Sequence, residues 1–334
     1  NGSSRKAYNS AIQPLQYRSR QHRLQLRQPP PIHLLLGNFR WDTNGTTIAS
    51  NGTPGSTANQ LNSPYTLVID KYDHMYIADT QNHRIQKVVL SSLVITTVVG
   101  NGTGLNTPTN LLLPTAVYVD KNQIIYTADL SSYRIRLWTN SFTSTNIAGA
   151  NSTFIQRVCG LWVDSIGTIY AADAVFNYVI KFPVGALTGT IVAGSGIAGN
   201  NTNQLNLPWG LYVDETNSLL YVSNSGGNTV AKWSIGSSTG TFLVGPSGLN
   251  STLLNHPLGI TRDDYGNLYV ADCYNNRIQM YCASNISEGI TIIGDGVGTD
   301  STHLDCPTSV AFDSNSTLYV SDLANHRVQK YTKL

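Results

Sequence analysis

The segment Tyr319-Val-Ser-Asp-Leu-Ala-Asn-His-Arg-Val-Gln329 decides the fold, because related segments recur along the chain. Each recurrence holds an apolar stretch that begins with Tyr and ends three residues later at Asp79, Asp129, Asp173, Asn224, Asp272 or Asp322. An earlier apolar stretch in each repeat ends at Asp70, Asp120, Asp164, Asp214, Asp263 or Asp313. These first-column aspartates are 50, 44, 50, 49 and 50 residues apart. A third alternation and a short fourth run complete each repeat, and four short strands in about 50 residues predict a β-propeller blade.

The six repeats resemble the NHL repeat family. Asn82-His-Arg-Ile-Gln86 and Asn325-His-Arg-Val-Gln329 match the motif that names the family. A proline also stands six residues before most first-column aspartates, at Pro64, Pro114, Pro208, Pro257 and Pro307. The resemblance covers residues 41–334 and implies an all-β, six-bladed propeller of four-stranded blades. It implies little about function, because one fold carries many functions.

The last repeat ends at Leu334 after its third strand and therefore lacks a fourth. Thr46–Ser50, followed by Asn-Gly-Thr, looks like the fourth-strand segment Thr96–Gly100, which is also followed by Asn-Gly-Thr. We therefore expect Thr46–Ser50 to complete the sixth blade and close the ring, which removes two free sheet edges. No stretch has a helical period, so we expect almost no helix.

Residues 1–40 form a second region, an extended arm rich in Arg, Gln and Pro. The arm holds seven Lys and Arg and no acid, whereas residues 41–334 have a net charge of -5. We expect it to dock on its own propeller or on a neighbouring copy, with Ile32–Leu36 adding as a strand to a blade edge. Docking on a neighbour would give head-to-tail assembly. The alternative is a solvated linker.

The repeated acidic residues have a structural interpretation. We expect the first-column aspartates to cap the following turn through backbone hydrogen bonds, with a metal or catalytic role as the alternative. We expect the second-column aspartates to form ion pairs with an arginine five residues later, in the pairs Asp79–Arg84, Asp129–Arg134, Asp272–Arg277 and Asp322–Arg327. Blade four replaces both members, by Asn224 and Thr229.

Blade three keeps the second-column acid, Asp173, but has Tyr178 where the arginine should stand. Asp173 is therefore the acid with the least obvious partner. Together with Tyr178 it is a candidate for contact with a ligand, and drift in a degenerate blade is the alternative.

Enzyme motifs are missing from the sequence, and we predict no catalytic residue, metal site or cofactor. The nearest enzymatic relatives implied by the resemblance are peptidyl-hydroxyglycine lyases, which hold zinc with histidines placed directly after the blade prolines. The corresponding residues here are Tyr65, Thr115, Gly160, Trp209, Leu258 and Thr308. His256 precedes its proline instead. This pattern disfavours a lyase.

Nine Asn-x-Ser/Thr sequons indicate an extracellular glycoprotein. Besides Asn1, they begin at Asn44, Asn51, Asn101, Asn151, Asn200, Asn250, Asn285 and Asn315. Those from Asn51 to Asn250 recur at intervals of 49 or 50 residues, which places each in a loop between blades on one face. We predict N-glycans at most of them; the alternative is that these asparagines only serve the turns. Because no signal peptide opens it, we expect the chain to be a processed product.

The four cysteines fit an oxidising compartment. Cys273 follows the second strand of blade five, and Cys306 precedes blade six on the same face, so we predict a disulfide between them. Cys282 ends a third strand on the other face. Cys159 has no obvious partner in its own chain, and a head-to-tail stack of chains could bring it together with Cys282.

Charge and hydropathy exclude other classes. Only 12% of residues are charged, the net charge of +2 does not indicate nucleic acid, and no apolar run is long enough to span a bilayer. We therefore predict a secreted, N-glycosylated, non-catalytic structural or interaction protein whose partners are other protein chains, including copies of itself. The alternative is a propeller enzyme or small-ligand binder that uses the channel mouth, lyase-like and metal-dependent.

Overall fold

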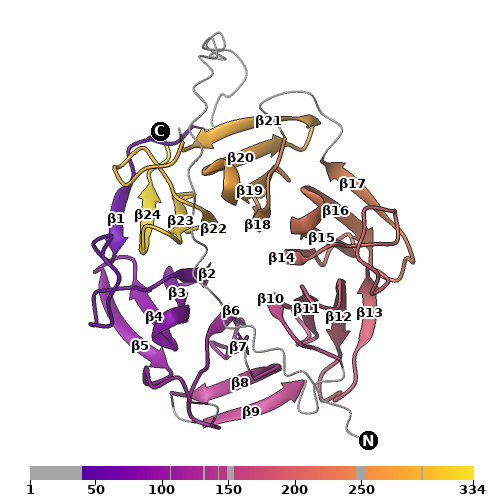
Figure 1. Ribbon diagram of the computed structural model, residues 1–334, viewed down its shortest axis with the longest axis horizontal. Coiled ribbons are helices and arrows are strands. Elements are labelled where there is room, and N and C mark those ends of the chain that lie inside the picture. Colours follow the sequence, from indigo (N-terminus) through magenta and orange to yellow (C-terminus); the bar gives the residue numbers. More distant parts are fainter. Residues whose placement is uncertain are drawn as a thin grey trace, which may run out of the picture. The chain divides into compact units, whose positions relative to one another are not determined.

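The computed structural model describes residues 40–334, apart from residues 106, 131, 142, 149–153, 246–252 and 295. The predicted arm lies outside the described residues except for its last residue, Arg40. The described region is a six-bladed β-propeller in which every blade is a four-stranded antiparallel sheet. Figure 1 shows the six sheets arranged around a central axis. The predicted fold class is confirmed.

The strands of the first three blades follow one another directly in sequence. Blade one consists of β2 (Pro64–Ile69), β3 (His74–Asp79), β4 (Arg84–Val89) and β5 (Val94–Val99). Blade two consists of β6 (Pro114–Val119), β7 (Ile125–Asp129), β8 (Arg134–Asn140) and β9 (Thr143–Ala148). Blade three consists of β10 (Val158–Val163), β11 (Ile169–Asp173), β12 (Tyr178–Phe182) and β13 (Thr190–Ala193).

The remaining blades follow the same order, except that the last one takes its outer strand from the start of the region. Blade four consists of β14 (Pro208–Asp214), β15 (Leu219–Asn224), β16 (Thr229–Ser234) and β17 (Gly240–Val244). Blade five consists of β18 (Pro257–Arg262), β19 (Leu268–Asp272), β20 (Arg277–Cys282) and β21 (Asn285–Ile293). Blade six consists of β22 (Pro307–Phe312), β23 (Leu318–Asp322), β24 (Arg327–Tyr331) and β1 (Thr46–Ala49).

Ring closure occurs as the sequence predicts. Strand β1 pairs antiparallel with β24, with Thr46 opposite Lys330 and Ala49 opposite Val328, and the two strands lie side by side in Figure 1. The only helical elements among the described residues are three single 3-10 turns, η1 (Thr80–Asn82), η2 (Ser225–Gly227) and η3 (Cys273–Asn275). The expectation of almost no helix therefore holds.

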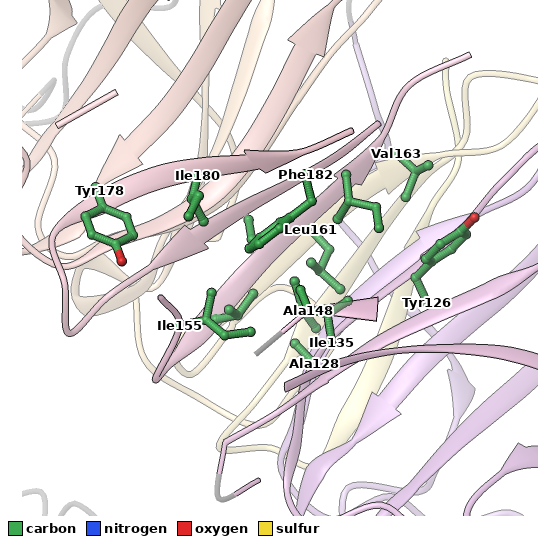
Figure 2. Close-up of a cluster of buried hydrophobic side chains, with 14 residues drawn as sticks. Tyr126, Ala128, Ile135, Ala148, Ile155, Leu161, Val163, Tyr178, Ile180 and Phe182 are labelled. Atoms are coloured by element: carbon green, nitrogen blue, oxygen red, sulfur yellow. The ribbon is translucent and has the colours of Figure 1, made fainter. Parts of the chain in front are cut away.

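The core lies between neighbouring blades, where the apolar faces of two sheets meet. Figure 2 shows the cluster between blades two and three, in which Ile135, Leu161, Val163 and Phe182 interdigitate. Alternate residues of each strand enter such a cluster, which is the period-two pattern of a strand with neighbours on both faces. The propeller therefore holds its shape through blade-to-blade packing around the axis.

The innermost strand of every blade carries a bulge near its start. In blade one, Pro64 lies opposite Asp79, but the register shifts before Leu67 pairs with Ile77. The same shift follows the first residue of β6, β10, β14, β18 and β22. A bulge leaves two residues opposite one and turns side chains out of the ladder. The bulge therefore determines which residues near the start of each inner strand point toward the central axis of the propeller.

Candidate functional site

The first-column aspartates cap the turns between the first and second strands, as predicted. In blade five, Asp263 Oδ1 accepts the backbone N–H of Tyr265 at 3.0 Å and of Asn267 at 2.9 Å. Its Oδ2 accepts the hydroxyl of Tyr269 at 2.9 Å. Asp70, Asp120, Asp164 and Asp313 accept the same pair of backbone N–H groups in their own blades. This column is structural.

The second-column ion pairs are present in blades one, five and six. Asp322 accepts Arg327 Nε at 2.8 Å, Asn325 Nδ2 at 2.9 Å and the backbone N–H of Asp305 at 2.7 Å. Arg327 also donates to the carbonyls of Thr299, Asp300 and His303. Burial raises the pKa of Asp322 in spite of these donors. Each pair thus ties the turn between strands two and three to the loop that enters the blade.

Blade two corrects the predicted pairing. Asp129 forms its ion pair with Arg136, not with Arg134, and Ser132 Oγ also donates to its carboxylate. Arg136 is fully buried and takes the place that Gln86, Gln279 and Gln329 hold in other blades. Its longer, charged side chain reaches Asp129 from two residues further along the strand. A second arginine in a glutamine column was the signal in the sequence.

In blade four, Asn224 and Thr229 replace the Asp–Arg pair and form a hydrogen bond with each other. Asn224 Nδ2 donates to Thr229 Oγ1 at 3.0 Å and to Asn200 Oδ1 at 2.9 Å. Asn224 Oδ1 accepts the backbone N–H of Asn206. A neutral amide therefore fills the same position without a charged partner.

Asp173, the acid with the least obvious partner in the sequence, has backbone partners in the structure. Its carboxylate is fully buried and accepts the backbone N–H groups of Gln156, Arg157, Val175 and Phe176. The Tyr178 hydroxyl donates to the carbonyl of Phe154 at 2.7 Å. Backbone donors thus replace the missing arginine, because several N–H groups can satisfy a buried carboxylate. Both side chains are engaged within their own blade and its entry loop.

Consecutive blades are also joined by a hydrogen bond that the sequence analysis does not predict. His83 Nδ1 accepts the backbone N–H of Leu113 at 3.1 Å, and His326 Nδ1 accepts that of Ser63 at 3.0 Å. Asn177, Asn228 and Asn276 accept the equivalent N–H groups with their side-chain oxygens. The histidines that occupy the family motif therefore join consecutive blades.

A channel runs along the axis between the six inner strands β2, β6, β10, β14, β18 and β22. It holds a cavity of about 300 Å³. The strands approach closely in blades three to five, where a Cβ added to Gly160 or Gly210 would lie 2.1 or 2.4 Å from the carbonyl oxygen of Trp209 or Leu258. Glycine is required there because the backbones of neighbouring blades touch.

The residues directly after the first residue of each inner strand surround one end of this channel. The structure corrects one of them, because Val158 lies opposite Asp173 as Pro64 lies opposite Asp79. Cys159, and not Gly160, therefore follows the position of the missing proline. The set is Tyr65, Thr115, Cys159, Trp209, Leu258 and Thr308, and it contains no histidine.

This end of the channel is aromatic, and we refer to Tyr65, Arg157, Trp209, His256 and Tyr274 as the channel mouth. The rings of Tyr65 and Trp209 stack with centroids 5.6 Å apart, and those of His256 and Tyr274 stack at 4.6 Å. Trp209 and His256 meet edge to face at 6.4 Å. The Arg157 guanidinium lies over the Trp209 ring at 5.6 Å. Sequence periodicity does not predict this gathering, because its members come from different blades.

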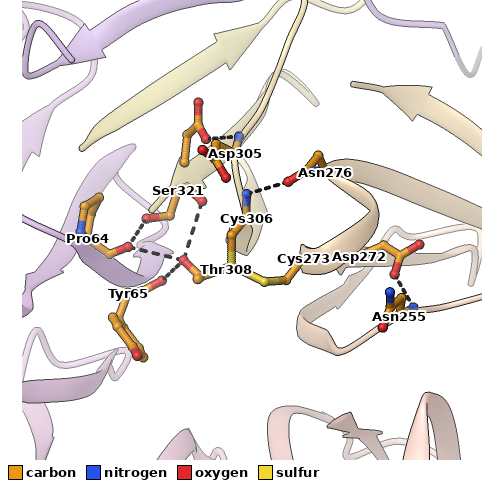
Figure 3. The surroundings of a disulfide bond; sticks show 11 residues. Pro64, Tyr65, Asn255, Asp272, Cys273, Asn276, Asp305, Cys306, Thr308 and Ser321 are labelled. Atoms are coloured by element: carbon orange, nitrogen blue, oxygen red, sulfur yellow. Dashed lines mark hydrogen bonds between the residues drawn. A yellow bond between two sulfur atoms is a disulfide. The ribbon is translucent and has the colours of Figure 1, made fainter. Parts of the chain in front are cut away.

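The predicted disulfide is present beside the mouth: Cys273 of blade five and Cys306 of blade six are joined, with Cα atoms 4.0 Å apart (Figure 3). Cys306 also donates its backbone N–H to Asn276. Cys159 and Cys282 are free thiols. Cys159 packs in the same apolar cluster as the disulfide, and burial raises the pKa of its thiol to about 12. That thiol is therefore protonated at neutral pH.

The described sequon asparagines are all exposed, namely Asn44, Asn51, Asn101, Asn200, Asn285 and Asn315. Asn51, Asn101 and Asn200 lie in loops that lead from an outer strand into the next blade, on the same face as the channel mouth. Asn151 and Asn250 lie outside the described residues. Exposure makes the described sequons accessible, and occupancy stays a prediction.

Two surveys of the described residues bear on other functions. No group of three or more His, Cys, Asp or Glu side chains gathers there in a way that could hold a metal ion. No helix in the described part of the chain is long and apolar enough to cross a membrane.

Comparison with known proteins agrees with this architecture. The NHL repeat model matches residues 254–281 and 304–331, which correspond to the three inner strands of blades five and six. The chain thus carries NHL repeats in a six-bladed propeller. No curated protein matches it by sequence.

Solved structures share the fold at low sequence identity. A Bacteroides thetaiotaomicron protein of unknown function is 14% identical with a TM-score of 0.70, over 88% of this chain and 76% of that chain. A Xanthomonas campestris gluconolactonase is 12% identical with a TM-score of 0.64, over 86% and 89%. The Staphylococcus aureus virginiamycin B lyase, solved with quinupristin, is 14% identical with a TM-score of 0.57, over 84% and 83%. Similarity at this level establishes the fold alone.

Proposed function

We propose that this protein is a secreted, N-glycosylated NHL-repeat propeller that acts as a non-catalytic interaction protein outside the cell. The observation that carries the proposal is the placement of the sequons. Asn51, Asn101 and Asn200 are exposed in the loops between blades on one face, with Asn51 and Asn101 two residues after an outer strand and Asn200 seven residues after β13. Glycans there would extend into solvent without disturbing the core. The Cys273–Cys306 disulfide adds support, because such bonds persist in oxidising compartments.

Peptide mapping of protein purified from its source tests the glycosylation. We expect glycans at most of Asn51, Asn101, Asn151, Asn200 and Asn250, detected as deamidation after enzymatic deglycosylation in heavy-oxygen water. A matched control lies in Asn217, which is followed by Ser and Leu and forms no sequon. Unmodified asparagines at all five positions would reject the secreted glycoprotein.

We propose that the interaction includes copies of the same chain, joined through the basic arm. Residues 1–40 contain seven Lys and Arg, whereas the propeller region has a net charge of -5. Opposite charges favour docking between the two. Deleting residues 1–36 leaves β1 intact, so the propeller should still fold. We expect light scattering to show a shift from assemblies to monomers on this deletion. An unchanged assembly state in the truncated protein would reject the arm as the connector.

A second candidate function is small-ligand binding at the channel mouth. The observation that favours it is the cavity of about 300 Å³ that opens beneath Cys159 and Trp209. A metal-dependent, lyase-like form of this alternative predicts stoichiometric zinc or calcium in purified protein. Elemental analysis separates it from the non-catalytic function, because only the former requires bound metal.

A further inference from the structure

The channel mouth contains a cation without an acidic partner. Arg157 stands immediately before β10 and is partly buried. Other partly or fully buried arginines pair with acids, as in Arg84 with Asp79, Arg136 with Asp129 and Arg262 with Asp214. No acidic side chain in the described ranges forms an ion pair with Arg157. A guanidinium carries five donors, and partial burial makes an unmatched charge costly.

Blade three places this arginine at the mouth by departing from the repeat. The residue before the inner strand has a left-handed backbone in the other five blades, at Ser63, Leu113, Leu207, His256 and Cys306. Arg157 does not adopt that conformation, and its backbone N–H donates to Asp173 within its own blade at 3.1 Å. The loss of the blade proline at Val158 and the gain of Arg157 therefore occur together.

The surroundings of the Arg157 guanidinium are mainly aromatic. Its guanidinium covers Trp209, which stacks on Tyr65. Burial and the nearby Arg157 both lower the pKa of His256, so the imidazole is neutral at neutral pH. Burial raises the pKa of the Tyr65 hydroxyl, which therefore stays protonated and can donate. A positive charge between aromatic faces, with hydroxyl and imidazole donors nearby, suits an anion that has a flat body.

Two threonine hydroxyls beside the mouth already have hydrogen-bond partners. Thr308 Oγ1 donates to the carbonyl of Tyr65 at 2.6 Å, and Thr115 Oγ1 donates to that of Val158 at 2.6 Å. Trp209 belongs to the mouth and also lines the cavity, together with Cys159. A ligand therefore finds a cavity with a mixed polar and apolar lining below, and the Arg157 guanidinium above. About 300 Å³ is enough for a single-ring molecule.

We propose that the channel mouth binds a small aromatic carboxylate, with the carboxylate on the Arg157 guanidinium and the ring in the cavity that Trp209 lines. Arginine recognises carboxylates through two parallel hydrogen bonds, and aromatic side chains at a cavity wall favour an aromatic ligand. This inference rests on the second candidate function, small-ligand binding at the channel mouth, and does not depend on glycosylation, secretion or assembly. The proposed binding is non-covalent and involves no chemical reaction.

Calorimetric titration of the full chain with 4-hydroxyphenylacetate tests the site. The neutral isostere 4-hydroxyphenylacetamide and the cation tyramine serve as probes of the same ring with a different charge. We expect the acid to bind at least about tenfold more tightly than the amide, and tyramine not to bind. Equal affinity for acid and amide, or no binding of the acid at about 10 mM, would overturn the proposal.

Variants assign the charge to one residue. Arg157→Gln should weaken binding of the acid at least about tenfold and leave binding of the amide unchanged. Arg157→Lys should keep part of the preference for the acid over the amide. Lys181→Gln removes the same charge from strand β12 of the same blade and should bind like the wild type. Thermal melts establish that each variant is folded. An Arg157→Gln protein that is folded and keeps the wild-type affinity for the acid refutes the site.

Discussion

His83 and Asn177 perform the same task with different chemistry. Both have a left-handed backbone, at φ 53° and 55°, and each accepts a backbone N–H from the next blade. Asn adopts this conformation more readily than most residues and accepts through its side-chain oxygen at any pH. His83 accepts through Nδ1 only while its imidazole is neutral. Two of the blade junctions, at His83 and His326, therefore depend on pH.

Stability should reflect this difference below neutral pH. Burial lowers the pKa of His83 and of His326 below the ordinary value of about 6.5. A depressed folded-state pKa gives stability that is complete above the unfolded pKa and is lost as pH falls from there through the folded pKa. We expect the double variant His83→Asn/His326→Asn to match the wild type at about pH 7.5 and to be more stable than it at about pH 5.

Urea unfolding of both proteins across this range measures the effect. The buried aspartates Asp272 and Asp322, whose pKa values burial raises, are common to both proteins and cancel in the comparison. His83→Ala/His326→Ala is the matched control that removes the acceptor altogether, and it should be destabilised at every pH. A difference between wild type and the Asn variant that does not change with pH contradicts the prediction.

At the scale of the element, ring closure extends beyond the hydrogen bonds between β1 and β24. Trp41 precedes β1, bridges Lys333 and is only 6% exposed. Its ring lies 5.8 Å from Phe312 and 5.7 Å from Tyr269 of the neighbouring blade. Its Nε1 donates to the carbonyl of Ser316 at 3.0 Å. One aromatic side chain thus anchors the closing strand to blades five and six.

We expect Trp41→Ala to lower the free energy of unfolding by about 3–5 kcal/mol, because it empties a buried aromatic site. Trp41→Phe keeps ring packing and loses the indole donor, so it should cost about 1–2 kcal/mol. Chemical denaturation followed by circular dichroism measures both. The anchor is not needed if Trp41→Ala unfolds at the wild-type denaturant concentration.

At the scale of the whole molecule, two devices join blade six to its neighbours. Strand β1 completes that blade and leads into blade one, while the Cys273–Cys306 disulfide joins it to blade five. The cross-linked cysteines are 33 residues apart. Chain-entropy arguments give a loop of this length about 3–4 kcal/mol of stability. The disulfide therefore adds its stability to blade six, the blade that closes the ring with strands from both ends of the propeller region.

The double variant Cys273→Ser/Cys306→Ser should lose about 3–4 kcal/mol of unfolding free energy under oxidising conditions. Cys282→Ser, which removes a free thiol, should leave it unchanged. A reductant should lower the denaturation midpoint of the wild type and not that of the double variant. If the reductant lowers both midpoints equally, the stabilisation does not come from this bond.

The sequence by itself determined the blades, their number and the closing strand. Each depends on interactions within a single repeat, where partners are close along the chain, as with Asp322 and Arg327 five residues apart. Turn capping by Asp263 is local in the same way. Even the distant pairing of β1 with β24 was predictable, because Thr46–Ser50 copies a fourth strand whose place in a blade is known. Because the repeats share one pattern, the place of each strand in its blade can be predicted without knowledge of the folded shape.

Only the tertiary structure decided in which direction a side chain points and which residues meet between blades. Arg136 reaches Asp129 because its side chain is directed across a sheet, which spacing along the strand does not reveal. The bulge after Val158 moves Cys159 into the channel set and sends Gly160 against the next blade. Arg157, Trp209 and His256 meet around the axis although they belong to three blades. Radial packing brings them together, and radial packing depends on the register of every inner strand at once.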